Sequence, residues 1–319
     1  MLFDTPILFL IFNRPNEAQQ VFNQIKKVKP RFLFIAADGP RDGNLQDIEK
    51  CTQARKILEQ IDWNCELKIL FREKNLGCGR GVSSAISWFF GQVEEGIILE
   101  DDCFPSDSFF YFCKKMLVEY RNNSQIFSIC GSNFLHKPFQ AQAGYYYSQH
   151  HIIWGWATWK RAWDRYDYSL SGWKDFLNRE LVIQLMENYY HKNKVIIDRL
   201  THDFDMFLEG KIDTWDFQWF YTCIINNAFS LIPTHNLISN IGIDGAHSVG
   251  SESKNHNIPF FNIDIDLIKK PEAFVSNFKL ERAIFKHHNL WPLGSYKRGY
   301  KILRTVLSSV KRMVKRFEF

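Results

Sequence analysis

GIILEDD, from Gly96 to Asp102, is a short apolar run that ends in three consecutive acids. An unbroken apolar run of this length is typical of a strand buried on both faces, as in a parallel sheet. Adjacent carboxylates repel one another. In open α/β sheets, ligands bind just beyond the carboxyl ends of the strands. The stretch therefore predicts an α/β fold with an acidic ligand site at a strand end.

The segments before this run alternate between strand and helix. Residues 6–12 (PILFLIF), 31–37 (RFLFIAA) and 66–71 (ELKILF) read as strands, whereas residues 45–60 and 79–90 read as helices. Pro15 opens a further helix at its first position, where the missing N–H group costs nothing. We therefore expect a mostly parallel, Rossmann-like sheet with helices on both faces.

This alternation stops near residue 140, where tryptophans, tyrosines and short helices take over. No proline- or glycine-rich linker separates the two parts. We expect one catalytic domain over residues 1–292, with a donor-binding half at about 1–130 and an acceptor-binding half at about 131–292. Residues 293–319 read as a separate helix.

Positive charge is concentrated at the C-terminal end. Residues 295–319 hold eight basic residues and one acid, so this tail carries +7 and the rest of the chain carries −2. The body is therefore not suited to nucleic acid. A basic helix with an apolar stripe fits an anionic membrane surface, although a helix packed on the domain has the same pattern. The stripe consists of Leu303, Val306, Leu307, Val310, Val314 and Phe317.

Three features bear on cellular location. The first residues show no basic leader or cleavage site, and the chain has no run of 18 apolar residues. The seven cysteines are scattered without a CxxC pair, which favours free thiols in a reducing compartment. We expect a cytoplasmic protein that is peripheral to the inner face of the membrane if the tail binds lipid.

The acidic triplet itself predicts a metal site. Carboxylate oxygens suit Mg²⁺ or Mn²⁺, which bridge to phosphate oxygens. A diphosphate leaving group needs such neutralisation as its bond to a sugar breaks. We expect Asp102 to be the direct metal ligand and Glu100 and Asp101 to contact the sugar or ribose. The alternative is a solvated acidic turn.

Several segments resemble one enzyme family. Residues 98–112, ILEDDCFPSDSFFYF, resemble the DxD-type segment of the GT-A glycosyltransferases, and especially of the N-acetylglucosaminyltransferase I branch. Residues 215–219 (WDFQW) resemble the Trp-Asp-Asp-Trp that supplies the catalytic base of that branch, with one Asp where the relative has two. Residues 238–248 (ISNIGIDGAHS) resemble its loop over the donor phosphates, and residues 154–156 (WGW) its Gly-Trp segment beside the sugar.

The resemblance covers about residues 5–250, in the order of the family. It implies a GT-A nucleotide-diphospho-sugar transferase fold and a metal-dependent glycosyltransferase. Such an enzyme moves a sugar from a nucleotide-sugar, here expected to be UDP-linked, to a hydroxyl group of an acceptor. The acceptor would be a glycan, a glycolipid or another lipid-linked or surface polysaccharide, and the expected reaction is an inverting displacement.

An acceptor hydroxyl is a poor nucleophile unless a nearby carboxylate takes its proton. The resemblance makes Asp216 the candidate base, and Asp213 is the nearby alternative. Asp216 also suits the N-cap of a helix that begins near Phe217, since Asp is favoured there.

The nucleotide of the donor is expected along the first strands. Phe12, Asn13 and Arg14 end the first strand, and Arg14 suits a phosphate or a base edge. By resemblance, Asp38 at the end of the second strand accepts a hydrogen bond from uracil; Asp-Gly-Pro is also ordinary turn chemistry. Residues 75–80 (NLGCGR) precede a helix whose N–H groups can face a diphosphate, with Arg80 as the stronger contact.

Four further residues are candidates for the donor site. Trp154 and Trp156 flank Gly155 and suit a platform for the sugar, although buried packing is the usual fate of tryptophan. His247 is expected to ligate the metal or hold a phosphate, and Ser248 to contact a phosphate. Both also fit an ordinary loop.

Two rival functions remain open at this point. A sugar-1-phosphate nucleotidyltransferase shares the α/β plan, but its glycine-rich signature after the first strand is missing from residues 12–15 (FNRP). A non-catalytic carbohydrate-binding protein would use the aromatic residues alone and leaves the triplet unexplained. The sugar, the acceptor, the linkage and the choice between inversion and retention also stay open.

Overall fold

The computed structural model of the protein describes residues 3–139, 142–190, 193–242 and 256–287. The strands are β1 Ile7–Ile11, β2 Phe32–Ala37, β3 Glu66–Phe71, β4 Glu95–Glu100, β5 Cys103–Pro105, β6 Ile126–Cys130, β7 Tyr145–Ser148, β8 Trp156–Trp159, β9 Phe229–Pro233 and β10 Ile238–Asn240. The helices are α1 Pro15–Val28, α2 Leu45–Arg55, α3 Gly77–Phe90, α4 Asp107–Tyr120, α5 Lys160–Trp163, α6 Ser171–Lys174, α7 Phe176–Tyr189, α8 Lys194–Leu208, α9 Asp216–Ile225 and α10 Phe278–His287, with a 3₁₀ turn at Lys56–Gln60.

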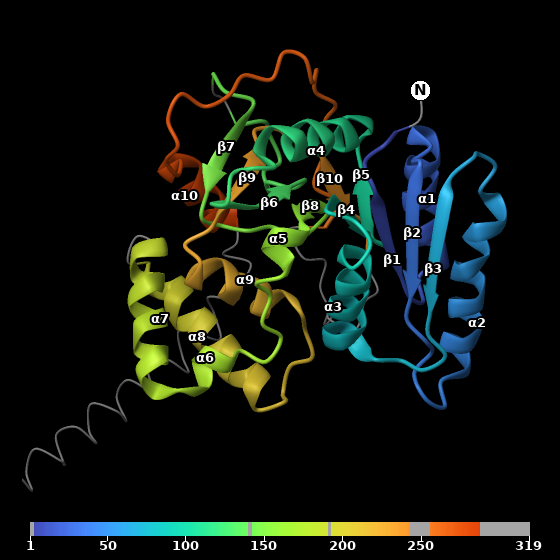
Figure 1. Ribbon diagram of the computed structural model, residues 1–319, viewed down its shortest axis with the longest axis horizontal. Coiled ribbons are helices and arrows are strands. Elements are labelled where there is room, and N and C mark those ends of the chain that lie inside the picture. Colours follow the sequence, from blue (N-terminus) through green and yellow to red (C-terminus); the bar gives the residue numbers. More distant parts are fainter. Residues whose placement is uncertain (1–2, 140–141, 191–192, 243–255, 288–319) are drawn as a thin grey trace, which may run out of the picture.

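The expected α/β fold is confirmed. Eight strands form one mixed sheet in the order β3-β2-β1-β4-β8-β6-β9-β7, flanked by helices (Figure 1). β3, β2, β1 and β4 run parallel, as the apolar runs of β1, β2 and β4 predict. β3 is the edge strand, and the exposed Glu66 and Lys68 interrupt its apolar residues. β8 is antiparallel to both of its neighbours, β4 and β6. Strands from both halves of the chain therefore share one sheet.

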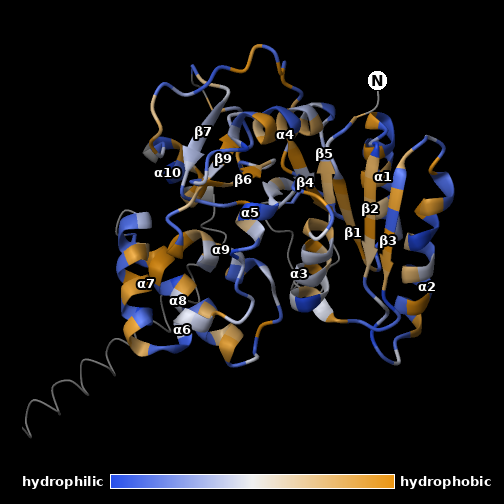
Figure 2. Cartoon of the chain, in the orientation of Figure 1, coloured by the Kyte–Doolittle hydropathy of each residue, from blue (hydrophilic) through white to orange (hydrophobic). Residues whose placement is uncertain are grey.

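The side chains of β1 alternate between two cores. Ile7, Phe9 and Ile11 pack in the core that includes α1 and α4, whereas Leu8 and Leu10 pack in the core that includes α3 and α9. Figure 2 shows β1 and β2 as hydrophobic along most of their length. This burial on both faces is what removes polar alternation from these strands and made them recognisable in the sequence.

A second helical layer adjoins this sheet. Helices α6, α7, α8 and α9 enclose a separate apolar core that includes Trp173 and Phe204. Helix α9 contributes to both this core and the core beneath α3, so it joins the helical layer to the sheet. As a result, Asp216, the first residue of α9, is held between the two layers.

Two further findings concern the cysteines and the lengths of the helices. All seven cysteines are free thiols. Among the described residues, none of the helices is both long and apolar enough to cross a bilayer.

Candidate functional site

The acidic triplet lies where the strand order reverses. β1 has β2 on one side and β4 on the other, because the chain runs outward to β3 before it returns to β4. Glu100 is the last residue of β4, and Asp101 and Asp102 form the turn into β5. The crevice at such a reversal is where open α/β sheets bind ligands. Glu100 pairs with Leu10 across the ladder, which places its side chain on the face of α3 and α9.

The segment after β1 is bonded to this triplet. The backbone N–H of Phe12 donates to Oδ2 of Asp101 at 3.0 Å. One nitrogen of Arg14, Nη1, lies 2.9 Å from Oδ1 of Asp101 and 3.1 Å from Oδ2 of Asp102. Asp101 is 4% exposed, so Arg14 rather than bulk water balances its charge. Three of the sequence-predicted residues therefore meet in one charged cluster, with Arg14 as its internal cation.

The burial and the clustered charges of the triplet shift the pKa values of its acids. Burial, and then the charges of Asp102 and Asp101, raise the pKa of Glu100 above its usual value. Burial also raises the pKa of Asp101, although the charge of Arg14 opposes this shift. The charge of Asp216 is a further cause of the raised pKa of Glu100, so the structure brings these two carboxylates within electrostatic reach.

Asp216 begins helix α9 and is held at its start. Its Oδ1 accepts hydrogen bonds from the hydroxyl of Thr214 and, at 3.0 Å, from the backbone N–H of Phe217. The N-cap of α9 is Trp215, so Asp216 is the first helical residue and not the cap. A carboxylate in this position still complements the positive end of the helix dipole.

Asp213, the alternative base, is fixed elsewhere. Its Oδ1 accepts a hydrogen bond from the N–H of Gly79 at 3.0 Å, and a methyl group added to Gly77 would collide with its carboxylate. Gly77 has a φ of +80°, which side-chain-bearing residues rarely adopt. Asp213 thus occupies the N-terminus of α3, where the sequence suggested a diphosphate. Nearby, the guanidinium of Arg80 lies 4.5 Å from the centre of the Tyr168 ring.

Asp38 holds the loop that leads into α3. Its carboxylate accepts hydrogen bonds from the backbone N–H groups of Gly39, Leu76 and Gly77 and from the side chain of Asn75, at 3.0–3.2 Å. Burial raises its pKa, although these donors act in the opposite direction. Residues 38–40 form no assigned turn, so the carboxylate of Asp38 serves the distant loop at residues 75–77 instead, and contact with a uracil stays a prediction.

Asn13 faces a different part of the molecule. Its side chain donates to Asp47 at 2.8 Å, and Arg41 contacts the same carboxylate. The hydrogen bond from Arg41 lowers the pKa of Asp47 to about 2, with burial opposing the shift. Asn13 therefore anchors the start of α2, so its expected contact with the donor has no support in this geometry.

The two tryptophans beside Gly155 have different surroundings. Trp156 is 1% exposed and its ring stacks on Trp215, with ring centres 5.7 Å apart. Because the ring is enclosed in the core, the expectation that Trp156 forms a sugar platform has no support in this geometry. Trp154 is half-buried and stacks on His256 at 5.8 Å. It keeps an exposed part, so a sugar contact there stays a prediction.

The segment after β10 passes beside the triplet. β10 pairs with β5, and the N–H of Ile241 donates to the backbone oxygen of Asp102 at 2.8 Å. A methyl group added to Gly242 would lie 2.6 Å from Oδ2 of Asp102. The expected site residues His247 and Ser248 follow in the sequence but lie outside the described residues, as does the C-terminal tail.

The residues present are compatible with a metal ion that is held mainly by the phosphates of a bound substrate and only in part by protein side chains. Within the described ranges, no group of three or more His, Cys, Asp or Glu side chains is arranged around one position for an ion. Mg²⁺ is, however, commonly held by one or two carboxylates with substrate phosphates completing its shell. The side chain of Asp102 is 15% exposed, and its Oδ1 faces the weakly donating thiol of Cys103 at 3.5 Å. Asp102 fits this role, whereas the buried Asp101 does not.

Sequence reasoning missed some members of the site. Burial, followed by the charges of Glu100, Asp216 and Asp213, raises the pKa of the Cys78 thiol, so Cys78 lies among these acids. Tyr166 donates from its hydroxyl to the backbone oxygen of Trp215 and also feels the charge of Asp216. The sequence signal for Cys78 was its position in the glycine-rich loop at residues 75–80, which was already singled out.

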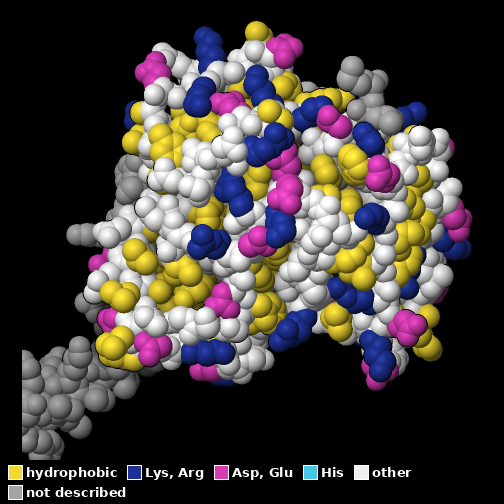
Figure 3. All heavy atoms as spheres, viewed as in Figure 1, with side chains coloured by type: hydrophobic (Ala, Val, Ile, Leu, Met, Phe, Trp, Pro, Cys, Tyr) yellow, Lys and Arg dark blue, Asp and Glu magenta, His cyan; other side chains and the backbone are white. Residues whose placement is uncertain are grey.

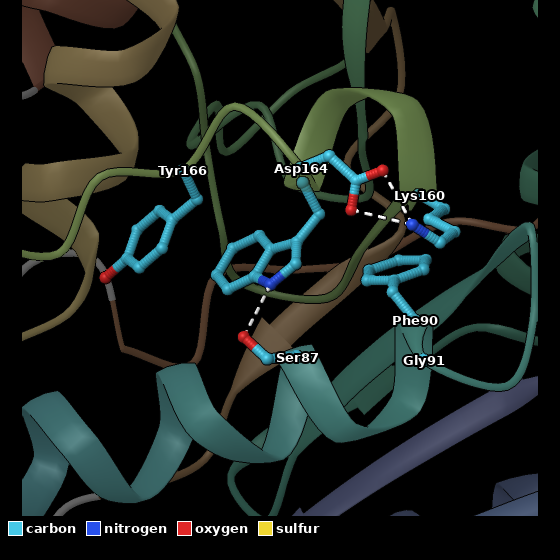
Figure 4. Close-up of a pocket in the computed structure, with 7 residues that line it drawn as sticks. Ser87, Phe90, Gly91, Lys160, Asp164 and Tyr166 are labelled. Atoms are coloured by element: carbon cyan, nitrogen blue, oxygen red, sulfur yellow. Dashed lines mark hydrogen bonds and ion pairs between the residues drawn. The ribbon is translucent and has the colours of Figure 1, made fainter.

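A small cavity of about 240 Å³ lies at the other end of α3, away from the triplet. Figure 4 shows Phe90 of α3 beside Lys160, which forms an ion pair with Asp164 at 2.7 Å. Ser87 of α3 accepts a hydrogen bond from the indole N–H of Trp163 at 3.0 Å. The cavity is also lined by Gly91, Trp163 and Tyr166. Because it contains none of the clustered acids, we place the candidate site at the triplet and not in this cavity.

Comparisons with known proteins add little. No protein-family model matches the chain, and no curated protein matches its sequence. Among solved structures, the chain is similar to mouse xyloside xylosyltransferase 1 in its apo form, with a TM-score of 0.32 and 10% sequence identity. The similarity covers 69% of this chain and 81% of that chain. At this TM-score it carries no conclusion about the present protein.

Proposed function

We propose that this protein is a metal-dependent glycosyltransferase of the GT-A type, which moves a sugar from a UDP-linked or similar nucleotide-sugar to an acceptor hydroxyl. The observation that carries the proposal is the acidic triplet at the reversal of strand order, with Asp216 of the second half within electrostatic reach. Carboxylates kept together at the cost of their mutual repulsion are concentrated at catalytic and ligand-binding sites.

Each carboxylate has a distinct role in this proposal. Asp102, the more accessible acid of the turn, would hold Mn²⁺ or Mg²⁺ together with the donor, and His247 is a second candidate ligand. The cation would supply neutralisation of the charge that develops on the departing diphosphate. Arg14 keeps Asp101 and Asp102 in place, because a single guanidinium nitrogen contacts both. Glu100 would accept a hydrogen bond from the sugar or ribose.

The transfer step needs one proton acceptor. As the acceptor oxygen bonds to the anomeric carbon, the bond from that carbon to the diphosphate oxygen breaks, and the hydroxyl proton passes to Asp216. The bonds from Thr214 and Phe217 fix one oxygen of Asp216 and so orient its carboxylate. Attack from the face opposite the leaving group inverts the anomeric centre.

The remaining contacts are part of the proposal. Asp38, Arg80 and Trp154 are proposed to line the nucleotide, the phosphates and the sugar, in that order, and Ser248 to contact a phosphate. The acceptor would be a glycan or a lipid-linked saccharide, and residues 295–319 would hold the enzyme on an anionic membrane surface.

The test is a panel of nucleotide-sugars with and without Mn²⁺. A correct donor should raise the thermal midpoint in the presence of the metal, since a bound ligand stabilises the folded state, and should be consumed when acceptor is added. Asp102→Asn preserves shape but loses the charge, so metal-dependent turnover should fall by at least about 10²-fold. Donor transfer at the wild-type rate by this variant, or in excess chelator, would refute metal dependence.

A matched control separates charge at the site from charge on the surface. Asp107 is exposed on the first turn of α4 and pairs with Lys27. Asp107→Asn should leave turnover within about twofold, because exposed ion pairs contribute little. A protein in which no donor gives either a thermal shift or turnover would not be a glycosyltransferase.

A further inference from the structure

Helix α7 carries an apolar stripe on its outer face. Leu177, Leu181 and Leu185 follow one another at four-residue spacing and are 72%, 57% and 38% exposed. Side chains at this spacing lie along one side of a helix. The opposite side packs into the core shared with α8 and α9. Figure 3 shows hydrophobic side chains gathered over this part of the molecule.

An acidic edge borders the stripe. Glu180 and Glu187 follow Leu177 by three and ten residues, and at 3.6 residues per turn both fall on the same flank of the stripe. Both side chains are exposed. Gln184 and Asn188 complete the outer face. An apolar stripe with an acidic edge is complementary to an amphipathic helix whose apolar stripe has a basic edge.

The described chain ends beside this helix. Phe285 of α10 lies 6.2 Å, ring centre to ring centre, from Tyr190, the C-cap residue that follows α7. Figure 1 shows α10 next to that end of α7, and α10 ends at His287. The 15 residues from 288 to 302 can span up to about 50 Å when extended, whereas the 14 residues of α7 measure about 21 Å. The rest of the tail can therefore reach the whole stripe.

We propose that the stripe of α7 is the docking surface for residues 303–317 of the same chain. Their sequence repeats apolar residues on one helical face over 15 positions, about 22 Å as a helix, which matches the length of α7. Docking places the leucines of α7 against that face and brings Lys311 and Lys315 to the edge formed by Glu180 and Glu187. The docked face is also the one that a lipid surface would take, so docking and membrane binding exclude each other.

The experiment uses the full chain and a zero-length carbodiimide, which joins carboxylates to lysine amines in direct contact. Cross-links from Glu180 or Glu187 to Lys311 or Lys315 should form in the absence of lipid. Leu181→Glu should reduce their yield at least fivefold. The control is Val118→Glu on α4, because Val118 is 56% exposed and Leu181 is 57% exposed; its cross-links should match those of the wild type.

Hydrogen exchange gives an independent measurement. Backbone amides of α7 should exchange faster in full-length Val310→Glu than in the wild type. Equal exchange together with absent cross-links would overturn the proposal. In a mixture of isotope-labelled and unlabelled chains, cross-links between the two kinds of chain would assign the stripe to a second copy. Protection of α7 from exchange that needs vesicles would assign the stripe to lipid. Either result would also refute docking within one chain.

Discussion

At the scale of single residues, Asp213 and Asp216 are three positions apart in the sequence but have different hydrogen-bond partners. Asp213 accepts a hydrogen bond from Gly79 and is committed to the start of α3. Oδ1 of Asp216 accepts hydrogen bonds from Thr214 and Phe217, and the charge of Asp216 contributes to the raised pKa of Glu100. The two residues therefore have different surroundings, and Asp216 stays our candidate for the proton acceptor of the proposed reaction.

Asp216→Asn keeps the shape of the side chain but removes its ability to take a proton. Turnover with the correct donor should fall by roughly 10²–10⁴. Donor affinity, measured by titration, should barely change. Asp213→Asn should cost less in turnover because its role is structural. A larger loss for Asp213→Asn would transfer the role of base to that residue, and full activity of both variants would favour a retaining mechanism.

Glu100 makes the stability of the protein depend on pH. Its folded-state pKa is raised by burial and by the neighbouring acids, above an unfolded value of about 4.5. The folded state therefore holds this proton more tightly, and stability is lost as the pH rises above the unfolded pKa. Glu100→Gln removes the charge, so its thermal midpoint should exceed that of the wild type at neutral pH.

The difference between Glu100→Gln and the wild type should shrink towards zero as the pH falls to about 4, where Glu100 is protonated in both states. The matched control is Glu94→Gln, because Glu94 is exposed just before β4. A midpoint for Glu100→Gln that stays at or below the wild type across this range would mean that the carboxylate is not electrostatically disfavoured.

At the scale of elements, the sequence predicted what local patterns encode. Three of the four parallel strands, β1, β2 and β4, contain continuous apolar runs, and Pro15 sits at the first position of α1, as expected. Trp156, the first residue of β8, is expected from the sequence to form a sugar platform with Trp154, because the sequence carries no sign of which neighbours enclose its ring. The bond between Gly79 and Asp213 joins residues 134 apart, and no local pattern indicates such a contact.

The start of α3 offers a sharp test of that long-range contact. Gly77→Ala should destabilise the fold in two ways, through its φ of +80° and through collision with Asp213. Gly43→Ala is the matched control, since Gly43 has a φ of +71° with nothing within 4 Å of an added methyl group. The left-handed backbone alone should cost each variant about 1–2 kcal/mol.

Denaturant unfolding should therefore show a larger loss of free energy for Gly77→Ala than for Gly43→Ala. Adding Asp213→Ala should recover most of the difference at Gly77 and none at Gly43, because only the first pair is in contact. Equal losses at the two glycines would show that Asp213 moves away at little cost.

At the scale of the whole molecule, the basic tail of the proposed enzyme is predicted to bind an anionic membrane surface. Each basic residue near an anionic surface contributes about 1 kcal/mol, and apolar insertion adds to this attraction. Anionic vesicles should co-sediment the full chain, neutral vesicles should do so less, and added salt should release it. A chain ending at Pro292 should lose vesicle binding but keep transfer to a soluble acceptor. Equal binding by both chains would remove the tail from membrane contact.

The enclosed tryptophans have a consequence for how the site can be observed. Trp156, Trp163, Trp215 and Trp219 form a cluster with contacting ring centres 5.3–6.4 Å apart. Indoles at such separations exchange excitation energy, so light absorbed by any of them is shared by the group. Trp215 directly precedes Asp216 in the chain. Emission from the cluster is thus an unlabelled optical signal whose source lies one residue from the proposed catalytic base.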